Sequence, residues 1–91
     1  MIIALDYDGT FTADPQLWRE FIINSTSRGH TVYIVTMRRP EECICFDDTI
    51  QQICEIIYTS RKAKKSFVEL HNMKFDIWID DNPEWLFIDT I

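Results

Sequence analysis

The sequence lacks any long hydrophobic run. No apolar stretch approaches the roughly 20 residues that a membrane-spanning helix needs. A secretory signal peptide begins with a basic segment before its apolar residues, and this sequence has no such segment there. Repeats, linkers and low-complexity tracts are absent as well. We therefore expect a single domain over residues 1–91 that makes no contact with a membrane and works in the cytoplasm.

Paired cysteine motifs are also missing. The three cysteines, Cys43, Cys45 and Cys54, contain no CxxC pair. Reduced thiols, as in other cytoplasmic proteins, are the expected state. A metal site that adds His30 and His71 to these cysteines is the weaker alternative, because the two histidines are distant in sequence and do not have the spacing of a metal motif.

Positive charge is scarce, with 9 Lys and Arg against 15 Asp and Glu, and the formal net charge is −6. This balance argues against general binding of nucleic acid, which depends on surplus Lys and Arg. The cations that are present gather at Arg38-Arg39 and at residues 61–65. Such clusters fit one anionic group held at one place, and a solvated basic loop is the alternative.

Apolar segments rich in β-branched residues alternate with segments of helical periodicity. We expect strands at residues 2–5, 31–36, 55–59 and 76–80. Each strand is followed by a helical segment, so the pattern predicts an α/β fold with a parallel four-stranded sheet and helices on both faces.

The helix signals differ in strength. Asp14 and Pro15 are typical of an N-cap and a first helical residue, and Gly29 is placed to end that helix. A second helix is expected to begin at residues 39–42, although Asp47-Asp48-Thr49 could break it in two. A short helix is expected around residues 67–70, after the basic loop, and a last one from Asn82-Pro83.

Every predicted strand ends in polar groups suited to phosphate chemistry. Asp6 and Asp8 follow the first strand, Thr36 ends the second, a lysine-rich loop follows the third, and Asp80-Asp81 follow the fourth. In open α/β sheets, ligands bind beyond the carboxyl ends of the strands. We therefore expect these groups to meet at one edge of the sheet.

These strand ends resemble the four motifs of the haloacid dehalogenase-like (HAD) superfamily of phosphohydrolases. The first motif, DxDG[TV], matches residues 6–10; the second, a Ser or Thr at a strand end, matches Thr36; the fourth, an acidic pair, matches Asp80-Asp81. The match covers nearly the whole chain. The shortness of the chain resembles that of small family members encoded by bacteriophages. The resemblance implies a three-layer Rossmann-like fold.

The resemblance also implies a Mg²⁺-dependent phosphatase. Asp6 would be the nucleophile that forms an aspartyl-phosphate, and the Asp8 side chain would be the general acid and base. Asp6, the backbone carbonyl of Asp8 and the side chain of Asp80 would bind Mg²⁺. Asp81 would bind Mg²⁺ through a water molecule or hold the residues that bind it. The alternative is that Asp81 stabilises the dipole at the N-terminus of the following helix.

Phosphate binding is implied for Gly9, Thr10 and Thr36 and for one or more lysines. Arg61-Lys62-Ala63-Lys64 resembles the RKPxP form of the third motif, which favours Lys62 as the catalytic lysine, although Ala63 stands in place of the proline. The spacing to Phe67 favours Lys64 instead. We expect Lys62 to be the catalytic lysine and both Lys62 and Lys64 to contact phosphate.

No segment is long enough for the cap domain that many family members insert over their site. An open site fits a large substrate or a second subunit that covers it. The expected substrate is a phosphomonoester, with a nucleotide or a nucleic-acid-end phosphate as the first choice. The alternatives are a non-enzymatic binding protein with this fold and a phosphotransferase that uses an acceptor other than water.

Overall fold

The computed structural model describes residues 1–91, and its centre is a sheet of four parallel strands in the order β3-β2-β1-β4. The register places Ile3 of β1 opposite Val32 of β2 on one side and opposite Ile77 of β4 on the other. All pairings are parallel, as predicted. The strands are β1 (Ile2–Leu5), β2 (Thr31–Thr36), β3 (Glu55–Tyr58) and β4 (Ile77–Ile79).

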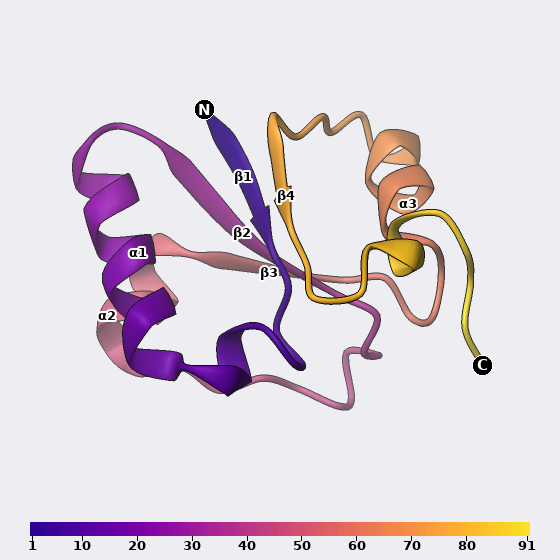
Figure 1. The fold of residues 1–91 in the computed structure, drawn as a ribbon, viewed down its shortest axis with the longest axis horizontal. Coiled ribbons are helices and arrows are strands. Elements are labelled where there is room, and N and C mark those ends of the chain that lie inside the picture. Colours follow the sequence, from indigo (N-terminus) through magenta and orange to yellow (C-terminus); the bar gives the residue numbers. More distant parts are fainter.

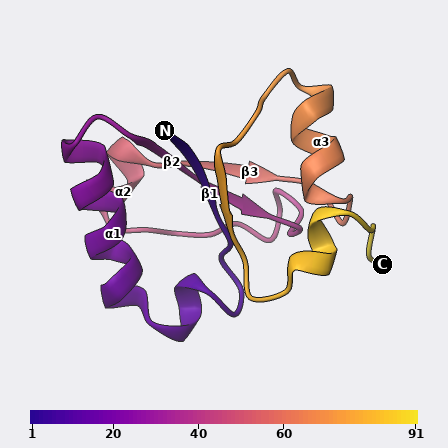
Figure 2. The same cartoon turned by 45° about the horizontal axis from the view of Figure 1, so that its top comes forward.

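Helices cover both faces of this sheet (Figure 1). The helices α1 (Pro15–Ser27) and α2 (Asp48–Ile53) lie on one face, where Leu5 of β1 and Ile22 of α1 belong to one buried cluster. The helix α3 (Lys64–Leu70) lies on the other face, where its Val68 packs in a second cluster with Ala4 of β1. Figure 2 shows the same separation from a second direction. The α/β prediction is confirmed, and the arrangement is consistent with a Rossmann-like fold.

The first helix begins and ends where the sequence predicts. Asp14 caps α1, and its Oδ1 accepts a hydrogen bond from the backbone N–H of Leu17 at 3.2 Å. Pro15 is the first helical residue. Gly29 follows the helix with φ +89°, a left-handed conformation that glycine adopts without a steric penalty. A short 3₁₀ turn, η1 (Phe11–Ala13), separates β1 from α1.

The second predicted helix is wrong over its first half. Residues 39–47 form turns and irregular backbone, and α2 begins only at Asp48. Asp47 is its N-cap, with its Oδ1 accepting from the N–H of Ile50 at 3.1 Å. The acidic run therefore starts a helix instead of interrupting one, because an aspartate accepts hydrogen bonds from the free N–H groups of a first helical turn.

Two other elements differ from prediction in ways that affect the site. The helix α3 begins at Lys64, inside the segment expected to be a basic loop. The last segment is a single 3₁₀ turn, η2 (Pro83–Leu86), instead of a helix. Strand β3 ends one residue earlier than predicted, and β4 is shorter than predicted by one residue at each end. No helix has the length and apolar character needed to cross a membrane.

Candidate active site

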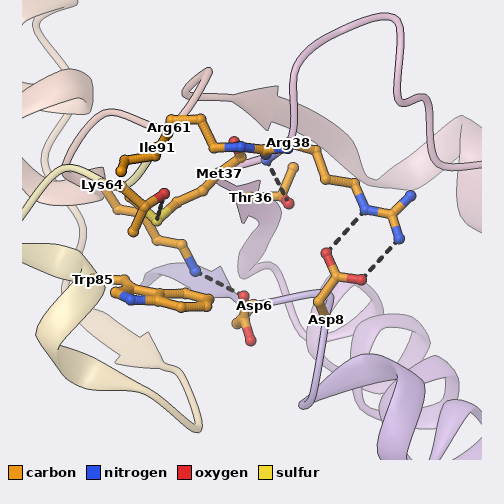
Figure 3. Close-up of a pocket in the computed structure, with 10 residues that line it drawn as sticks. Asp6, Asp8, Thr36, Met37, Arg38, Arg61, Lys64, Trp85 and Ile91 are labelled. Carbon is orange, nitrogen blue, oxygen red and sulfur yellow. Dashed lines mark hydrogen bonds and ion pairs between the residues drawn. The ribbon is translucent and has the colours of Figure 1, made fainter.

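The carboxyl ends of the strands meet at one edge of the sheet, as the sequence predicts. Asp6 follows β1, Thr36 ends β2 and Asp80 follows β4. Together with Asp8 and Lys64, Asp6 and Thr36 line an open pocket of about 380 Å³ (Figure 3). The four strand ends thus contribute to one region, which is the expected place for a ligand in this class of fold.

A buried lysine joins the first and last strand ends. The ammonium Nζ of Lys64 lies 2.7 Å from Asp6 Oδ1 and 2.6 Å from Asp80 Oδ2. The side chain of Lys64 is only 1% exposed. Burying a charge is costly unless it is paired, and Lys64 has two carboxyl partners. Asp6 and Asp80 therefore point into the same space, with one cation between their oxygens.

Lys62, expected to be the catalytic lysine, does not reach this space. Its side chain is 67% exposed, and its Nζ lies 4.0 Å from Asp89 Oδ2. Lys62 lies in the turn before α3, whereas Lys64 is the first residue of α3 and its side chain reaches Asp6 and Asp80. Lys65 also points away and pairs with Glu69 on the helix surface. Of the three lysines, only Lys64 contacts Asp6.

Thr10 and Asp81 complete a cluster around Asp6. The Oγ1 of Thr10 lies 3.0 Å from Asp6 Oδ2 and 3.1 Å from Asp81 Oδ1. The same oxygen accepts a hydrogen bond from the backbone N–H of Asp81 at 3.1 Å. Thr10 was expected to bind phosphate, but in this structure its hydroxyl connects two carboxyl groups. It therefore fixes their relative position.

The cluster has the donors that a small hard cation prefers. Asp6, Asp80 and Asp81 each offer a carboxylate oxygen, and these oxygens lie within 4.8 Å of one another. The carbonyl of Asp8, the other expected ligand, accepts no backbone hydrogen bond. Magnesium binds oxygen ligands, commonly one or two carboxylates together with water and phosphate. The residues present fit a divalent cation of this kind.

Burial governs the charge of Asp6. Desolvation raises its pKa from 3.8 to about 7, since removal from water disfavours the carboxylate, and this outweighs the opposing effect of Lys64. The adjacent Asp81 raises the pKa of Asp6 further. In turn, the hydrogen bond with Asp6 lowers the pKa of Asp81. Without a metal, the cluster therefore retains a proton at Asp6 up to about neutral pH.

This raised pKa predicts how the metal-free protein responds to pH. Between pH 4 and 7 the folded protein binds a proton at Asp6 that the unfolded chain releases, so its stability falls as the pH rises. One pKa unit corresponds to about 1.4 kcal/mol, so the loss is on the order of a few kcal/mol. Urea unfolding in EDTA at several pH values measures it. The Asp6→Asn variant should lack this slope, and an equal slope in that variant would contradict the assignment.

Asp8 lies at the opposite side of the pocket and is held by an arginine. Arg38 donates to it through Nε at 2.9 Å and Nη2 at 2.8 Å, and Asp8 remains 49% exposed. The guanidinium of Arg38 also lies over the ring of Tyr7, with its central carbon 5.1 Å from the ring centroid. The hydrogen bond to Asp8 raises the pKa of Arg38. No local pattern predicts this pair, which joins residues thirty positions apart.

Thr36 is placed as predicted, with its hydroxyl at the pocket. Its Oγ1 accepts a hydrogen bond from the backbone N–H of Arg38 at 3.2 Å. Only 2% of Thr36 is exposed, so its position is fixed by packing. Because its oxygen already accepts a hydrogen bond, its O–H remains free to donate to a ligand in the pocket.

Gly9 lies directly against Asp81. Its φ is +87°, and a Cβ built at this position would clash with the Asp81 carboxylate. Its backbone N–H donates to Thr12 Oγ1 at 2.9 Å. The sequence predicts a tight turn beside a phosphate at Gly9. The structure has that turn and shows a second reason for glycine, which is the close approach of Asp81.

The Gly9→Ala variant is therefore expected to lose both stability and metal affinity. A left-handed alanine costs about 1 kcal/mol or more, and its Cβ would also displace Asp81. Gly29→Ala is the matched control, because φ is +89° there but no atom lies within 4 Å of the added Cβ. Thermal unfolding with and without Mg²⁺ compares the two. Equal responses to Mg²⁺ in both variants would contradict the role of Gly9 in placing Asp81.

A segment near the end of the chain supports the lysine-bearing helix. Ala63, the N-cap residue of α3, has no side chain that can cap the helix. Asp89 Oδ1 accepts from the backbone N–H of Ala63 at 2.6 Å and so satisfies one of the free N–H groups at this helix end. The N–H of Thr90 donates to the carbonyl of Arg61 at 2.7 Å. Arg61 itself has φ +69°. Sequence reasoning missed Asp89, since a cap supplied from 26 positions away leaves no local pattern.

Removing this cap is expected to destabilise α3. Asp89→Ala should lower the free energy of unfolding by about 1 kcal/mol, because the N–H of Ala63 loses its hydrogen-bond acceptor. Asp89→Asn should lose much less, because an amide oxygen can still accept from Ala63. Urea unfolding of the two variants distinguishes capping from the longer ion pair with Lys62. Equal losses in both variants would assign the effect to the ion pair.

Comparisons with protein-family profiles, with curated proteins and with solved structures found no match to this chain.

Proposed function

We propose that the protein is a Mg²⁺-dependent phosphatase of the HAD type, which hydrolyses a phosphomonoester through an aspartyl-phosphate on Asp6. One observation carries this proposal: Lys64 is buried between Asp6 and Asp80, beside a third carboxylate, at the carboxyl edge of a parallel sheet. A buried lysine held by two acids has little structural justification, because such groups usually cost stability. It suits a site that handles an anionic group.

Asp6 would act as the nucleophile. A carboxylate oxygen of Asp6 forms a bond to phosphorus while the bond between phosphorus and the ester oxygen breaks. Water then attacks the phosphorus, the bond to Asp6 breaks, and inorganic phosphate leaves. Lys64 contacts Asp6 Oδ1, so it can orient the carboxylate and offset the negative charge of the transferred group. A bound Mg²⁺ would reduce the repulsion between the carboxylate and the phosphate.

Asp8 would move the protons. It would donate a proton to the departing ester oxygen and later take one from the attacking water. In this structure its carboxylate is held by Arg38. An incoming phosphate competes for the same guanidinium, because arginine binds phosphate and carboxylate with similar geometry. Arg38 would therefore release Asp8 as it binds substrate, while Thr36 donates its hydroxyl to a phosphate oxygen.

The test of this proposal is phosphate release from a chromogenic phosphomonoester, with Mg²⁺ and with EDTA. We expect turnover that requires Mg²⁺ and that is lost in the Asp6→Asn variant. The absence of turnover across a broad set of phosphomonoesters would favour a non-enzymatic binding protein. We also propose a cytoplasmic location, where thiols such as those of its three cysteines stay reduced.

A phosphotransferase is the second candidate, and the open pocket favours it. Asp6 and Asp8 line a pocket that is open to solvent, so an alcohol as well as water can reach the phosphoenzyme. Product analysis with added alcohols or nucleosides separates the two reactions. A phosphorylated acceptor as the main product would indicate transfer, and inorganic phosphate alone would indicate hydrolysis.

A further inference from the structure

The pocket at Asp6 extends to an aromatic wall. Trp85 lines it together with Met37 and Arg61, and Figure 3 shows the indole ring near the ends of Lys64 and Asp6. The ring belongs to the short turn η2, in which Leu86 is buried and Trp85 is partly buried. A tryptophan ring that lines a phosphate site can stack on a flat ring.

Most polar groups at this end of the pocket are already occupied. Arg61 donates through Nη1 to the carbonyl of Met37 at 2.7 Å and through Nη2 to Glu42 Oε2 at 2.8 Å. A sugar with many hydroxyl groups would therefore find few partners beyond the phosphate. A flat heterocycle needs few hydrogen bonds and gains from stacking.

We infer that the substrate of the hydrolase proposed above is a nucleoside monophosphate, whose base stacks on Trp85 while its phosphate lies between Asp6 and Arg38. This inference rests on the proposed function for its chemistry and on the pocket for its specificity. The volume of about 380 Å³ is within the range of roughly 300–1,000 Å³ that is usual for small-molecule sites.

The charges near the pocket favour a mononucleotide over the end of a nucleic acid. Arg38 is the cation assigned to the single phosphate of the substrate, and Arg61 is paired with Glu42. Lys65 is paired with Glu69, and the whole chain has a net charge of −6. Binding of a polymer draws most of its strength from unpaired cations that neutralise successive phosphates. With Arg61 and Lys65 paired, few cations near the pocket remain to neutralise the successive phosphates of a polymer.

A kinetic comparison tests the specificity. The ratio of kcat/KM for nucleoside monophosphates to kcat/KM for glycerol phosphate should fall roughly tenfold or more in Trp85→Ala, the loss expected from removing one base–aromatic stack. Trp85→Phe should retain most of the ratio, which controls for misfolding. An unchanged ratio in Trp85→Ala overturns the inference. So does faster turnover of a phosphorylated oligonucleotide or a phosphotyrosine peptide than of any mononucleotide.

A binding measurement separates this inference from the hydrolase itself. In the Asp6→Asn background with Mg²⁺, adding a nucleoside monophosphate should quench tryptophan fluorescence. The quench should persist when Trp78→Phe is added, because Trp78 packs against Phe75 away from the pocket, and it should vanish with Trp85→Phe. A quench that persists without Trp85 overturns the subsite. A quench at Trp85 in a protein that hydrolyses no phosphomonoester supports the nucleotide site and contradicts the hydrolase.

Discussion

Replacing Asp6 with asparagine is expected to reduce phosphate release by on the order of 10³-fold or more, because an amide oxygen is a poor nucleophile for phosphorus. The same change should not destabilise the protein at pH 8. It removes one of the two carboxylates that face Lys64 and leaves the ion pair between Lys64 and Asp80. Steady-state kinetics and urea unfolding of the same preparation measure both effects.

The Asp6 result needs a control for the loss of a carboxylate as such. Asp48→Asn serves this purpose, since Asp48 lies at the first turn of α2, outside the pocket. Its activity should stay close to that of the unaltered protein. If Asp6→Asn kept the same turnover as Asp48→Asn, a covalent role for Asp6 would be contradicted.

The second large effect is expected at Lys64. In Lys64→Met, the buried carboxylates of Asp6 and Asp80 lose their shared cation, which should lower the free energy of unfolding by about 3–5 kcal/mol at pH 8. Turnover should fall by roughly 10²-fold or more, because the transferred group loses a fixed positive charge. Thermal unfolding and kinetics at saturating Mg²⁺ provide the two measurements.

Lys62→Met is the matched control for this prediction. It removes the same chemical group two positions earlier, from a side chain that is mostly exposed. An exposed ion pair contributes little, so both stability and turnover should stay near those of the unaltered protein. Mg²⁺ should stabilise Lys64→Met more than it stabilises Lys62→Met, since only the first has lost the cation between the acids. Greater damage from Lys62→Met would reverse the assignment of the lysine.

Sequence reasoning predicted the sheet and the acidic cluster because their determinants are local. Apolar runs specified the four parallel strands, and Asp14, Pro15 and Gly29 specified the ends of α1. The topology of a parallel sheet then brings strand ends to one edge without further information. Asp6 and Asp80 could therefore be placed together although 74 positions separate them.

The features that sequence reasoning missed depend on tertiary contacts. Asp89 caps α3 from a distant segment, so the first residue of α3, and with it the inward direction of Lys64, had no local signal. Lys62 and Lys64 look alike in sequence, and only the start of the helix distinguishes them. The pairing of Asp8 with Arg38 likewise depends on how two loops meet at the sheet edge.

The most direct test of this account is an experimental structure of the protein with Mg²⁺ and beryllofluoride, which mimics a phosphoryl group on aspartate. We expect the fluoride group on a carboxylate oxygen of Asp6, a metal ion bound by Asp6 and Asp80, and Lys64 in contact with the fluoride group or with Asp6. A metal ion bound elsewhere, with Asp6 unmodified and still paired only with Lys64, would contradict the proposed chemistry.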